Sequence, residues 1–254
     1  RRSEGIVHER DQNVARPGSQ SGPGRFSEED LELLAAIGNH TGVALHRVRL
    51  LGEIERLLLD TVRAIAATID AKDGYTHRHS ERVATLASRI AAELGLGVDL
   101  QELAELSALL HDVGKIAVPD SILNKPGRLT VDEFAEMRKH PVHGARILAN
   151  IKSPLVAAVL PGVQYHHEKW DGSGYPEGLS GSRIPLLGRL LGVADFLDAL
   201  TSARAYREAK PLGDVVQLIA EGAGVQFDPD IAEAVVRLHA RGALNVDDET
   251  GPGS

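Results

Sequence analysis

Apolar residues recur along this 254-residue chain at spacings of three and four, and no stretch sustains an alternation of apolar and polar residues. The first pattern is typical of amphipathic helices, whereas alternation is typical of strands. Only 4% of the residues are aromatic, so a core must be built mainly from Ala, Leu, Ile and Val. Because sheets draw on aromatic and β-branched residues, this composition also favours packed helices. The sequence therefore predicts an all-α fold.

The composition excludes several classes of function. The chain has 28 Lys and Arg against 36 Asp and Glu, a net charge of -8, and an acidic surface is poorly suited to binding nucleic-acid polymers. It has no cysteine, which excludes disulfides and thiolate chemistry. We find neither a signal peptide nor a run of about 18 apolar residues, and we expect a cytoplasmic protein. Since the chain begins with Arg1 rather than Met, we also expect it to be a piece of a longer protein.

The amino-terminal part is predicted to be a polar segment followed by a long helix. Residues 1–25 are rich in Gly, Pro, Ser and Arg and cannot bury enough apolar surface to order themselves. Ser27 is predicted to cap a helix. From Leu50 to Ile69 apolar residues continue at helical spacing without a turn signal. Two interpretations stay open: this stripe forms the seam of a parallel dimer, or it packs on the next domain of the same chain.

Histidines and one aspartate recur in the compact region that follows. They are separated by about the length of one helix and its connection, so each helix could present one ligand at the same level of a bundle. An unpaired polar group on an apolar helix is costly, and the recurrence therefore indicates a shared site. His and carboxylate side chains are ligands of iron, manganese and zinc. The candidate ligands are His79, His111, His140, His166 and Asp195.

The segment LLHDVGKIAVPD carries the most informative pair, His111 and Asp112. The pair follows two leucines, so it should start from a buried helix face. Adjacent helical residues point about 100° apart, so the two can reach two metals, with the Asp112 carboxylate bridging. Lys115 lies four residues after His111 and would share its face on a helix. Two alternatives stay open for Lys115. It is a functional residue that holds a substrate phosphate or the attacking water, or it is a solvated lysine.

The segment YHHEKWDGSGYPEGL places His166 and His167 just before a glycine-rich loop. At a helix end the backbone can turn both imidazoles toward one metal. The loop carries Trp170, which either stacks against a base or simply packs the loop on the domain. Further along, Arg204 and Arg207 are one turn apart if helical. They either bind phosphate, for which arginine is suited, or form a solvated helix face.

With these motifs, the chain resembles the HD-GYP family, the cyclic di-GMP phosphodiesterases of the metal-dependent HD superfamily. The resemblance runs from about Asp70 to Leu238 and implies an HD-superfamily helical bundle with a long N-terminal linker helix. The motifs that carry it are DGYTHRHSERVATLA, LLHDVGKIAVPDSILNKPGRLT, MRKHPVHGARIL, YHHEKWDGSGYPEGLSG, IPLLGRLLGVADFLDALTSARAYR and GVQFDP.

The resemblance implies a site with two divalent metal ions. Iron or manganese is expected, and zinc accepts the same nitrogen and oxygen ligands. The implied ligands of the first ion are His79, His111 and Asp195, those of the second are His140, His166 and His167, and Asp112 bridges. The implied catalytic residues are Asp112 and Lys115, and the implied substrate contacts are Lys115, Tyr175, Arg204 and Arg207. Gly174, Tyr175 and Pro176 form the family's signature.

The chain departs from the family pattern at a few positions. Some members carry a Glu four residues before the first ligand His and use it for a third metal. Tyr75 stands there in this chain, so we expect two metals. Gly74 and Ala205 replace prolines that are common in the family, which leaves the ligands intact. His77 and His143 are additional histidines that we expect not to be ligands.

The amino-terminal segment GRFSEEDLELLAAIGNHTGVALHRVRLLGEIE resembles the end of a GAF sensor domain. We therefore expect a C-terminal remnant of a GAF-like domain over 1–49, a linker helix over 50–70, the catalytic domain over 71–244 and a disordered tail over 245–254. The resemblance implies hydrolysis of cyclic di-GMP to pGpG, and on to GMP if the site admits the linear dinucleotide, under an upstream sensor. The implied partners are a second copy through the linker helix and a GGDEF-type protein at the GYP loop.

Two other functions stay open. An HD hydrolase of another nucleotide would share the metal site but should lack the GSGYP loop, which this chain has. A non-catalytic receptor for cyclic di-GMP, or an interaction module, should have lost a metal ligand, and none of the expected ligands is missing. Metal content combined with a cyclic di-GMP hydrolysis assay separates these alternatives.

Overall fold

The computed structural model describes residues 26–73, 78–202 and 208–244. Across these ranges the chain forms helices and no strand, which confirms the predicted all-α fold. None of the described helices is both long and apolar enough to cross a membrane. Several sequence predictions lie outside the described residues: the polar segment 1–25, the tail 245–254, and the roles given to Gly74, Tyr75, His77, Arg204, Ala205 and Arg207.

The helices follow one another with short connections. In chain order they are α1 (Glu28–Lys72), α2 (His79–Glu93), α3 (Val98–Leu110), the 3₁₀ helix η1 (Val113–Ala117), α4 (Asp120–Leu123), α5 (Val131–Met137), α6 (His140–Leu148), α7 (Pro154–Tyr165), the 3₁₀ helix η2 (Gly181–Arg183), α8 (Leu186–Thr201), α9 (Leu212–Glu221) and α10 (Pro229–Ala240).

Helix α1 begins where the sequence predicts. The Oγ of Ser27 accepts a hydrogen bond from the backbone N–H of Asp30 at 3.2 Å, which satisfies one of the free donors of the first turn. The helix then continues to Lys72 without a break. The chain divides into two units, Arg1–Arg56 and Leu57–Ser254. In the first unit, the large apolar side chains of α1 are exposed to solvent, among them Leu31, Leu34, Ile37, Val48 and Leu51.

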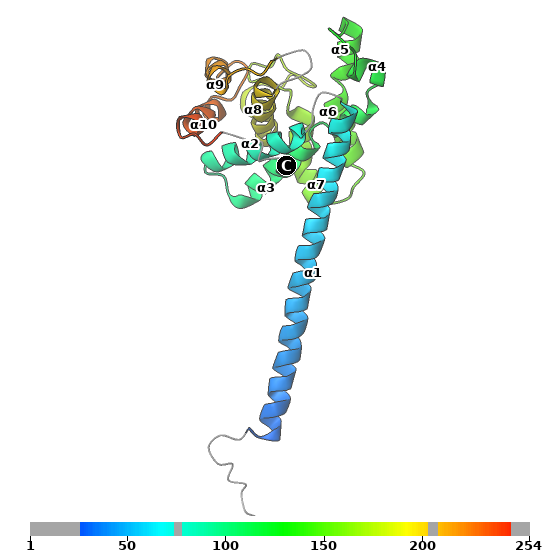
Figure 1. Cartoon of the computed structure of the whole chain (residues 1–254), viewed down its shortest axis with the longest axis vertical. Coiled ribbons are helices and arrows are strands. Elements are labelled where there is room, and N and C mark those ends of the chain that lie inside the picture. Colours follow the sequence, from blue (N-terminus) through cyan, green and yellow to red (C-terminus); the bar gives the residue numbers. More distant parts are fainter. Residues whose placement is uncertain (1–25, 74–77, 203–207, 245–254) are drawn as a thin grey trace, which may run out of the picture. The chain divides into compact units, whose positions relative to one another are not determined.

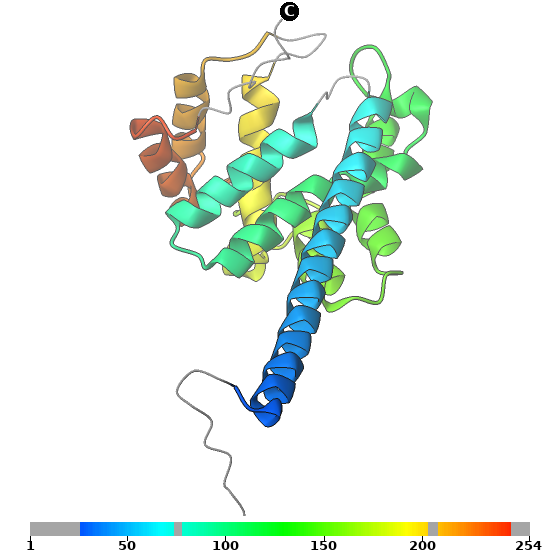
Figure 2. The same ribbon diagram turned by 60° about the horizontal axis from the view of Figure 1, so that its bottom comes forward.

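The second unit is built around one main hydrophobic core. Helices α2, α3 and α8 pack side by side, and α9 and α10 lie together next to α8 (Figures 1 and 2). The predicted apolar stripes of α2 and α3 supply much of this core, for example Val83, Ile90 and Leu109. A smaller cluster joins α3 to α7 and η1. Aliphatic residues make up nearly all of both clusters, as the low aromatic content indicates.

The candidate ligands are presented mainly at helix ends. His79 is the first residue of α2, His111 follows the last residue of α3, and His140 is the first residue of α6. His166 directly follows α7, at the helix end that the sequence predicts, while Asp195 lies inside α8. Five helices thus bring one ligand each to a common point, although four of the five ligands occupy ends rather than one level along parallel helices.

The placement of Lys115 corrects one expectation. His111 and Lys115 do not share a face of one α-helix, because α3 ends at Leu110 and Lys115 lies in η1. η1 packs closely against α6. A Cβ atom at Gly114 would lie only 1.9 Å from the carbonyl oxygen of His140, so this position tolerates no side chain.

Candidate metal centre

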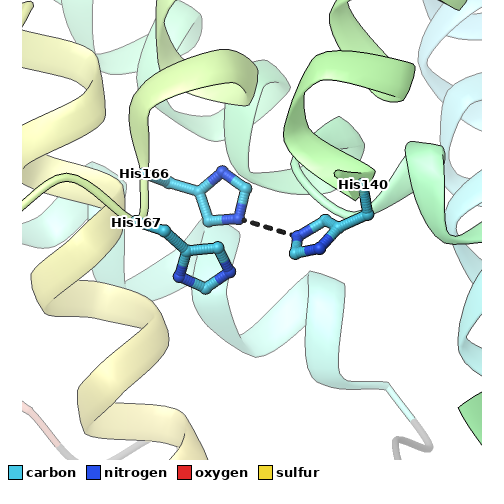
Figure 3. Close-up of side chains that lie close together, drawn as sticks. All are labelled: His140, His166 and His167. Carbon is cyan, nitrogen blue, oxygen red and sulfur yellow. Dashed lines mark hydrogen bonds between the residues drawn. The ribbon is translucent and has the colours of Figure 1, made fainter. Parts of the chain in front are cut away.

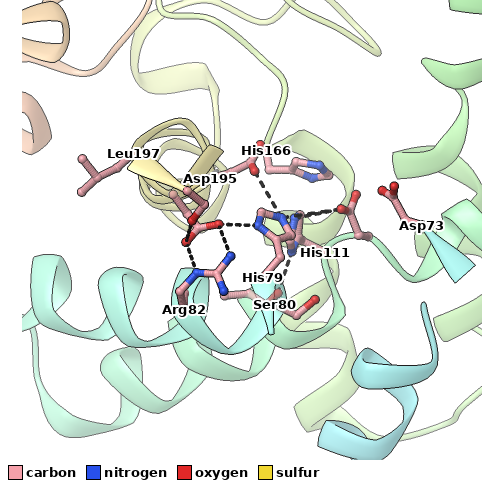
Figure 4. Close-up of polar contacts among 12 residues, drawn as sticks. Asp73, His79, Ser80, Arg82, His111, His166, Asp195 and Leu197 are labelled. Carbon is pink, nitrogen blue, oxygen red and sulfur yellow. Dashed lines mark hydrogen bonds and ion pairs between the residues drawn. The ribbon is translucent and has the colours of Figure 1, made fainter. Parts of the chain in front are cut away.

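Two groups of ligand atoms gather where these helix ends meet. In the first group, the ligand atoms of His79, His111 and Asp112 all lie within 4.8 Å of one another. Oδ2 of Asp112 is 3.3 Å from Nε2 of His111 and 3.8 Å from Nε2 of His79. Asp195 adds a second carboxylate, with Oδ1 3.4 Å from Nε2 of His79, and Figure 4 shows His79, His111 and Asp195 lying close together.

The second group consists of three histidines. The ligand atoms of His140, His166 and His167 also lie within 4.8 Å of one another. The Nε2 atoms of His140 and His166 are 3.3 Å apart, and the rings of His166 and His167 have centroids separated by 4.1 Å. Figure 3 shows the neighbours His166 and His167 both turned toward His140 from the end of α7.

Asp112 stands between the two groups. Its Oδ2 faces His79 and His111, whereas its Oδ1 lies 3.2 Å from Nε2 of His140. The two oxygens of one buried carboxylate therefore point to different groups. The structure brings together all seven side chains that the sequence suggests as ligands: His79, His111, Asp112, His140, His166, His167 and Asp195.

Three of the histidines have their outer ring nitrogen occupied by the backbone. Nδ1 of His111 donates to the carbonyl oxygen of Ala108 at 2.6 Å. His140 and His166 make the same bond to the carbonyl three residues earlier, at 2.9 and 2.8 Å. Because a carbonyl oxygen can only accept, the proton of each neutral ring sits on Nδ1. The lone pair of Nε2 is then directed at the centre, which is the arrangement of a metal-bound histidine.

His79 is oriented by a carboxylate that sequence reasoning missed. Nδ1 of His79 lies 2.7 Å from Oδ2 of Asp198, and Arg82 donates to the other oxygen of Asp198 at 2.6 Å. Asp198 is buried. The signal was present in the sequence, because Asp198 lies three residues after Asp195 and so shares a helix face with it.

The donor atoms fit divalent cations. Nε2 of His111 is buried and makes no hydrogen bond within the described part of the chain, and such an atom is costly unless something binds it. Burial, together with the adjacent imidazole of His167, holds the pKa of His166 well below its usual value. Burial and His140 lower the pKa of His167 to about 3. Both imidazoles therefore stay neutral, as a metal ligand must be.

The charges around Asp112 are consistent with this fit. Burial alone would raise its pKa, but His111 and Lys115 outweigh burial and hold the pKa well below its usual value. Burial alone would likewise lower the pKa of His111, yet the Asp112 carboxylate raises that pKa to about 9, so with no cation beside it His111 carries a proton on Nε2 that a bound metal ion would displace. The buried carboxylate thus requires positive charge beside it, and a divalent cation supplies that charge.

A cavity of about 450 Å³ opens onto these groups. Lys115 lines it, and its Nζ lies 2.7 Å from Asp73 and 2.7 Å from Asp112. Lys125 and Tyr175 line it as well. This volume is within the range of small-molecule sites, roughly 300–1,000 Å³. The cavity therefore holds metal-ligand atoms and cationic side chains within one ligand-sized space.

The loop that carries Tyr175 is held firmly at the mouth of this cavity. The ring of Tyr175 lies between His167, with centroids 4.8 Å apart, and the guanidinium of Arg138, 4.5 Å from the ring centroid. Oε1 of the buried Glu168 accepts hydrogen bonds from the backbone N–H groups of Glu177 and Gly178. Glu168 therefore fixes the loop from beneath.

The family of this chain follows from comparison with known proteins. A family model described as the HD domain matches residues 63–231, which includes every helix that supplies a candidate ligand. The chain belongs to the HD domain family. This membership confirms the resemblance drawn from the motifs, and the relatives named below agree with it.

Two curated relatives align with the HD domain of this chain. A cyclic di-GMP phosphodiesterase of Thermotoga maritima is 40% identical over 186 residues, covering 73% of this chain and 50% of the relative. The 3'3'-cGAMP-specific phosphodiesterase 2 of Vibrio cholerae is 35% identical over 211 residues, covering 83% and 40%. This chain therefore spans half or less of their lengths. A crystal structure of a cyclic GMP-AMP specific phosphodiesterase from V. cholerae shares the fold, with a TM-score of 0.57, 20% identity and coverage of 72% and 49%.

Proposed function

We propose that this HD domain is a metal-dependent phosphodiesterase that hydrolyses cyclic di-GMP to pGpG, and to GMP where the site also admits the linear dinucleotide. The position of Asp112 carries the proposal, because its two oxygens face two separate groups of histidines. This geometry supports two divalent ions, iron or manganese, with Asp112 shared between them. The substrate is supported by the relatives, several of which are named cyclic di-GMP phosphodiesterases.

Two bound ions would supply Lewis-acid polarisation of the phosphoryl group and activation of water near neutral pH. His79, His111 and Asp195 would hold one ion, and His140, His166 and His167 the other. Side chains of the protein would bind the substrate and stabilise charge. Two N–H donors of Lys115 are taken by Asp73 and Asp112, and no other described residue takes the third. That N–H is left for a phosphate oxygen, because an ammonium has three donors. Lys115 would then stabilise negative charge that grows on the phosphoryl oxygens.

Further parts of the proposal concern neighbouring groups. Tyr175, at the mouth of the cavity, would contact the substrate, and Arg204 and Arg207 are proposed to bind its phosphates.

A GGDEF-type partner at the GYP loop and a cytoplasmic location stay predictions. The division into a GAF-like remnant over 1–49, a linker over 50–70 and a catalytic domain over 71–244 is likewise part of the proposal, as is control by an upstream sensor.

We also propose that the chain forms a homodimer through the linker helix over 50–70, with the seam extending into the preceding part of α1. The exposed residues Leu34, Ile37, Val48 and Leu51 recur at heptad positions of this helix, which is the pattern of a coiled-coil seam. Exposed apolar side chains over such a length are unfavourable in water. A second copy in parallel would bury them and would give a sensor a rigid connection to the catalytic domain.

The proposed function is tested with protein prepared anaerobically and loaded with iron or manganese. Metal content is measured, and the products from cyclic di-GMP, 3'3'-cGAMP and bis(p-nitrophenyl) phosphate are identified by chromatography. We expect pGpG from cyclic di-GMP, with bound metal in the same preparation. Stoichiometric metal without any product from cyclic di-GMP, under both loadings, would show that the domain is a receptor or acts on another nucleotide.

A further inference from the structure

A second cavity, of about 260 Å³, adjoins the metal centre. It shares His167, Tyr175, Asp195 and Ala199 with the cavity described above. Its volume is slightly below the roughly 300 Å³ at which sites for drug-sized molecules begin. It is therefore suited to a single ring system rather than to a whole cyclic dinucleotide. Because the two cavities adjoin, a base bound in this one could stay covalently attached to a phosphate bound at the metal centre.

Aromatic side chains form its walls. Trp170, Phe196 and Phe227 line the cavity, and the rings of Phe196 and Phe227 pack edge to face with centroids 5.0 Å apart. The backbone of Trp170 is held on both sides, because its N–H donates to Gln226 at 3.2 Å and its carbonyl accepts from Gly181 at 2.8 Å. Trp170 is half-buried. The backbone thus holds Trp170 at the wall of this cavity, and an aromatic ring in such a place can stack on a base.

Arg189 supplies a polar group to the same cavity. Its guanidinium lies 5.9 Å from the centroid of the Trp170 ring. Nε donates to the carbonyl of Ile184 at 2.9 Å, and Nη1 pairs with the buried carboxylate of Asp228. Nη2 makes no hydrogen bond or ion pair to any residue that the structure describes. Arginine N–H groups match the O6 and N7 acceptors of guanine, whereas adenine presents a donor at the corresponding position.

We propose that this cavity is a nucleobase subsite that takes one guanine of the cyclic dinucleotide, with Trp170 as the stacking wall and Arg189 as the contact that favours guanine over adenine. The proposal rests on the proposed function in one respect, because the phosphate attached to that guanine would be bound at the metal centre. It assigns a role to Trp170, which the sequence alone leaves undecided between base stacking and loop packing.

The first test uses fluorescence, because Trp170 is the only tryptophan of the chain. The manganese-loaded protein is titrated with GMP, AMP and ribose 5-phosphate, with excitation at the long-wavelength edge of tryptophan absorption. We expect saturable quenching by GMP, weaker binding of AMP and no quenching by ribose 5-phosphate. Equal quenching by ribose 5-phosphate, or none by GMP, would overturn the subsite. This readout needs no catalysis.

The second test uses kinetics of the Trp170→Leu variant. Loss of one stacked base should lower kcat/KM for cyclic di-GMP by about 5- to 100-fold. Metal content and hydrolysis of bis(p-nitrophenyl) phosphate, which has no base, should be unchanged. Phe26→Leu is the matched control, because Phe26 is an exposed aromatic in the other unit. An equal loss on both substrates, or no loss on either, would contradict the proposal.

The third test addresses base selectivity. Arg189→Lys keeps the positive charge opposite Asp228 but removes the planar fork, so it should narrow the difference between GMP and AMP in the fluorescence titration at least severalfold. An unchanged preference would exclude Arg189 as the selective contact. If the wild type cleaves the base-free diester but not cyclic di-GMP, the proposed function fails, and the GMP titration still decides on the subsite.

Discussion

Nδ1 of His79 lies 2.7 Å from Oδ2 of Asp198, a residue 119 positions further along the chain. Both side chains are buried, and Arg82 holds the other oxygen of the same carboxylate. The carboxylate accepts the Nδ1 proton of His79 and directs its Nε2 at Asp112 and Asp195. Such outer partners fix the ring and raise its basicity as a ligand. Asp198 is therefore a positioning residue for the candidate metal centre.

Replacing Asp198 with Asn should weaken metal binding about 10- to 100-fold, the usual effect of removing an outer carboxylate partner. The amide keeps the size of the side chain but loses the charge that Arg82 and His79 share. Manganese affinity measured by calorimetry checks this expectation. Asp214→Asn, at an exposed position in the first turn of α9, is the matched control and should bind metal normally. Equal affinity in the two variants would assign Asp198 a structural role only.

The sequence predicts which side chains converge better than it predicts their local geometry. The recurrence of histidines in apolar segments identifies His79, His111 and His140, because a buried imidazole without a partner is costly. It does not show that they lie at helix ends, since a period of 3.6 locates a stripe but not the residue at which a helix stops. For this reason the prediction that Lys115 shares a helix face with His111 was wrong.

The hydrogen bonds that orient the candidate ligands and the GYP loop could not be predicted from local sequence patterns. The carbonyl acceptors of Ala108 and Val163 are backbone atoms, which carry no residue-type signal. The buried Glu168 beneath the GYP loop is an acidic residue in a polar stretch, and nothing in its spacing distinguishes it from a surface glutamate. Only the packed fold shows that its Oε1 receives two backbone N–H groups.

The Asp112→Ala variant should lose bound metal and lower phosphodiesterase activity by at least about a hundredfold, the scale expected for losing one preorganised electrostatic group. The reason is that the two oxygens of Asp112 face different groups of histidines. Elemental analysis and cyclic di-GMP turnover measure the outcome. Circular dichroism must show a folded protein, because Lys115 loses one of its partners. Retained turnover with normal metal content would disprove the bridging role.

Removing the proposed metal ions should destabilise the second unit, Leu57–Ser254. The ligand atoms converge only in the folded state, so a metal that binds the native protein at about 100 times its Kd adds about 2.7 kcal/mol. For a unit of this size that corresponds to a melting temperature about 5–10 °C higher. Thermal unfolding of metal-loaded and chelator-treated protein measures the difference, and manganese added back should restore it. Identical melting temperatures would mean that the seven side chains bind no metal.

Gly174 should tolerate no side chain. A Cβ atom there would lie 2.3 Å from the backbone nitrogen of Lys169 and 2.5 Å from Cα of Glu168, neither of which can move freely. Gly174→Ala should cost about 1–3 kcal/mol, as overpacking does, and should reduce activity by displacing Tyr175. Gly52→Ala is the control, because nothing lies within 4 Å of a Cβ there and alanine favours a helix. A stable, fully active Gly174→Ala variant would show that the loop adjusts.

The proposed dimer places Leu51 in a seam of α1. Leu51→Lys should shift the protein from dimer to monomer in light scattering at micromolar concentration, because two seam positions per dimer would then carry a charge. Val43→Lys is the matched control, since Val43 is also an exposed apolar residue of α1 but does not lie at a heptad position shared with Leu34, Ile37, Val48 and Leu51. It should leave the dimer intact. If the unaltered chain is a monomer, or if both variants dissociate equally, the apolar side chains of α1 have a different partner.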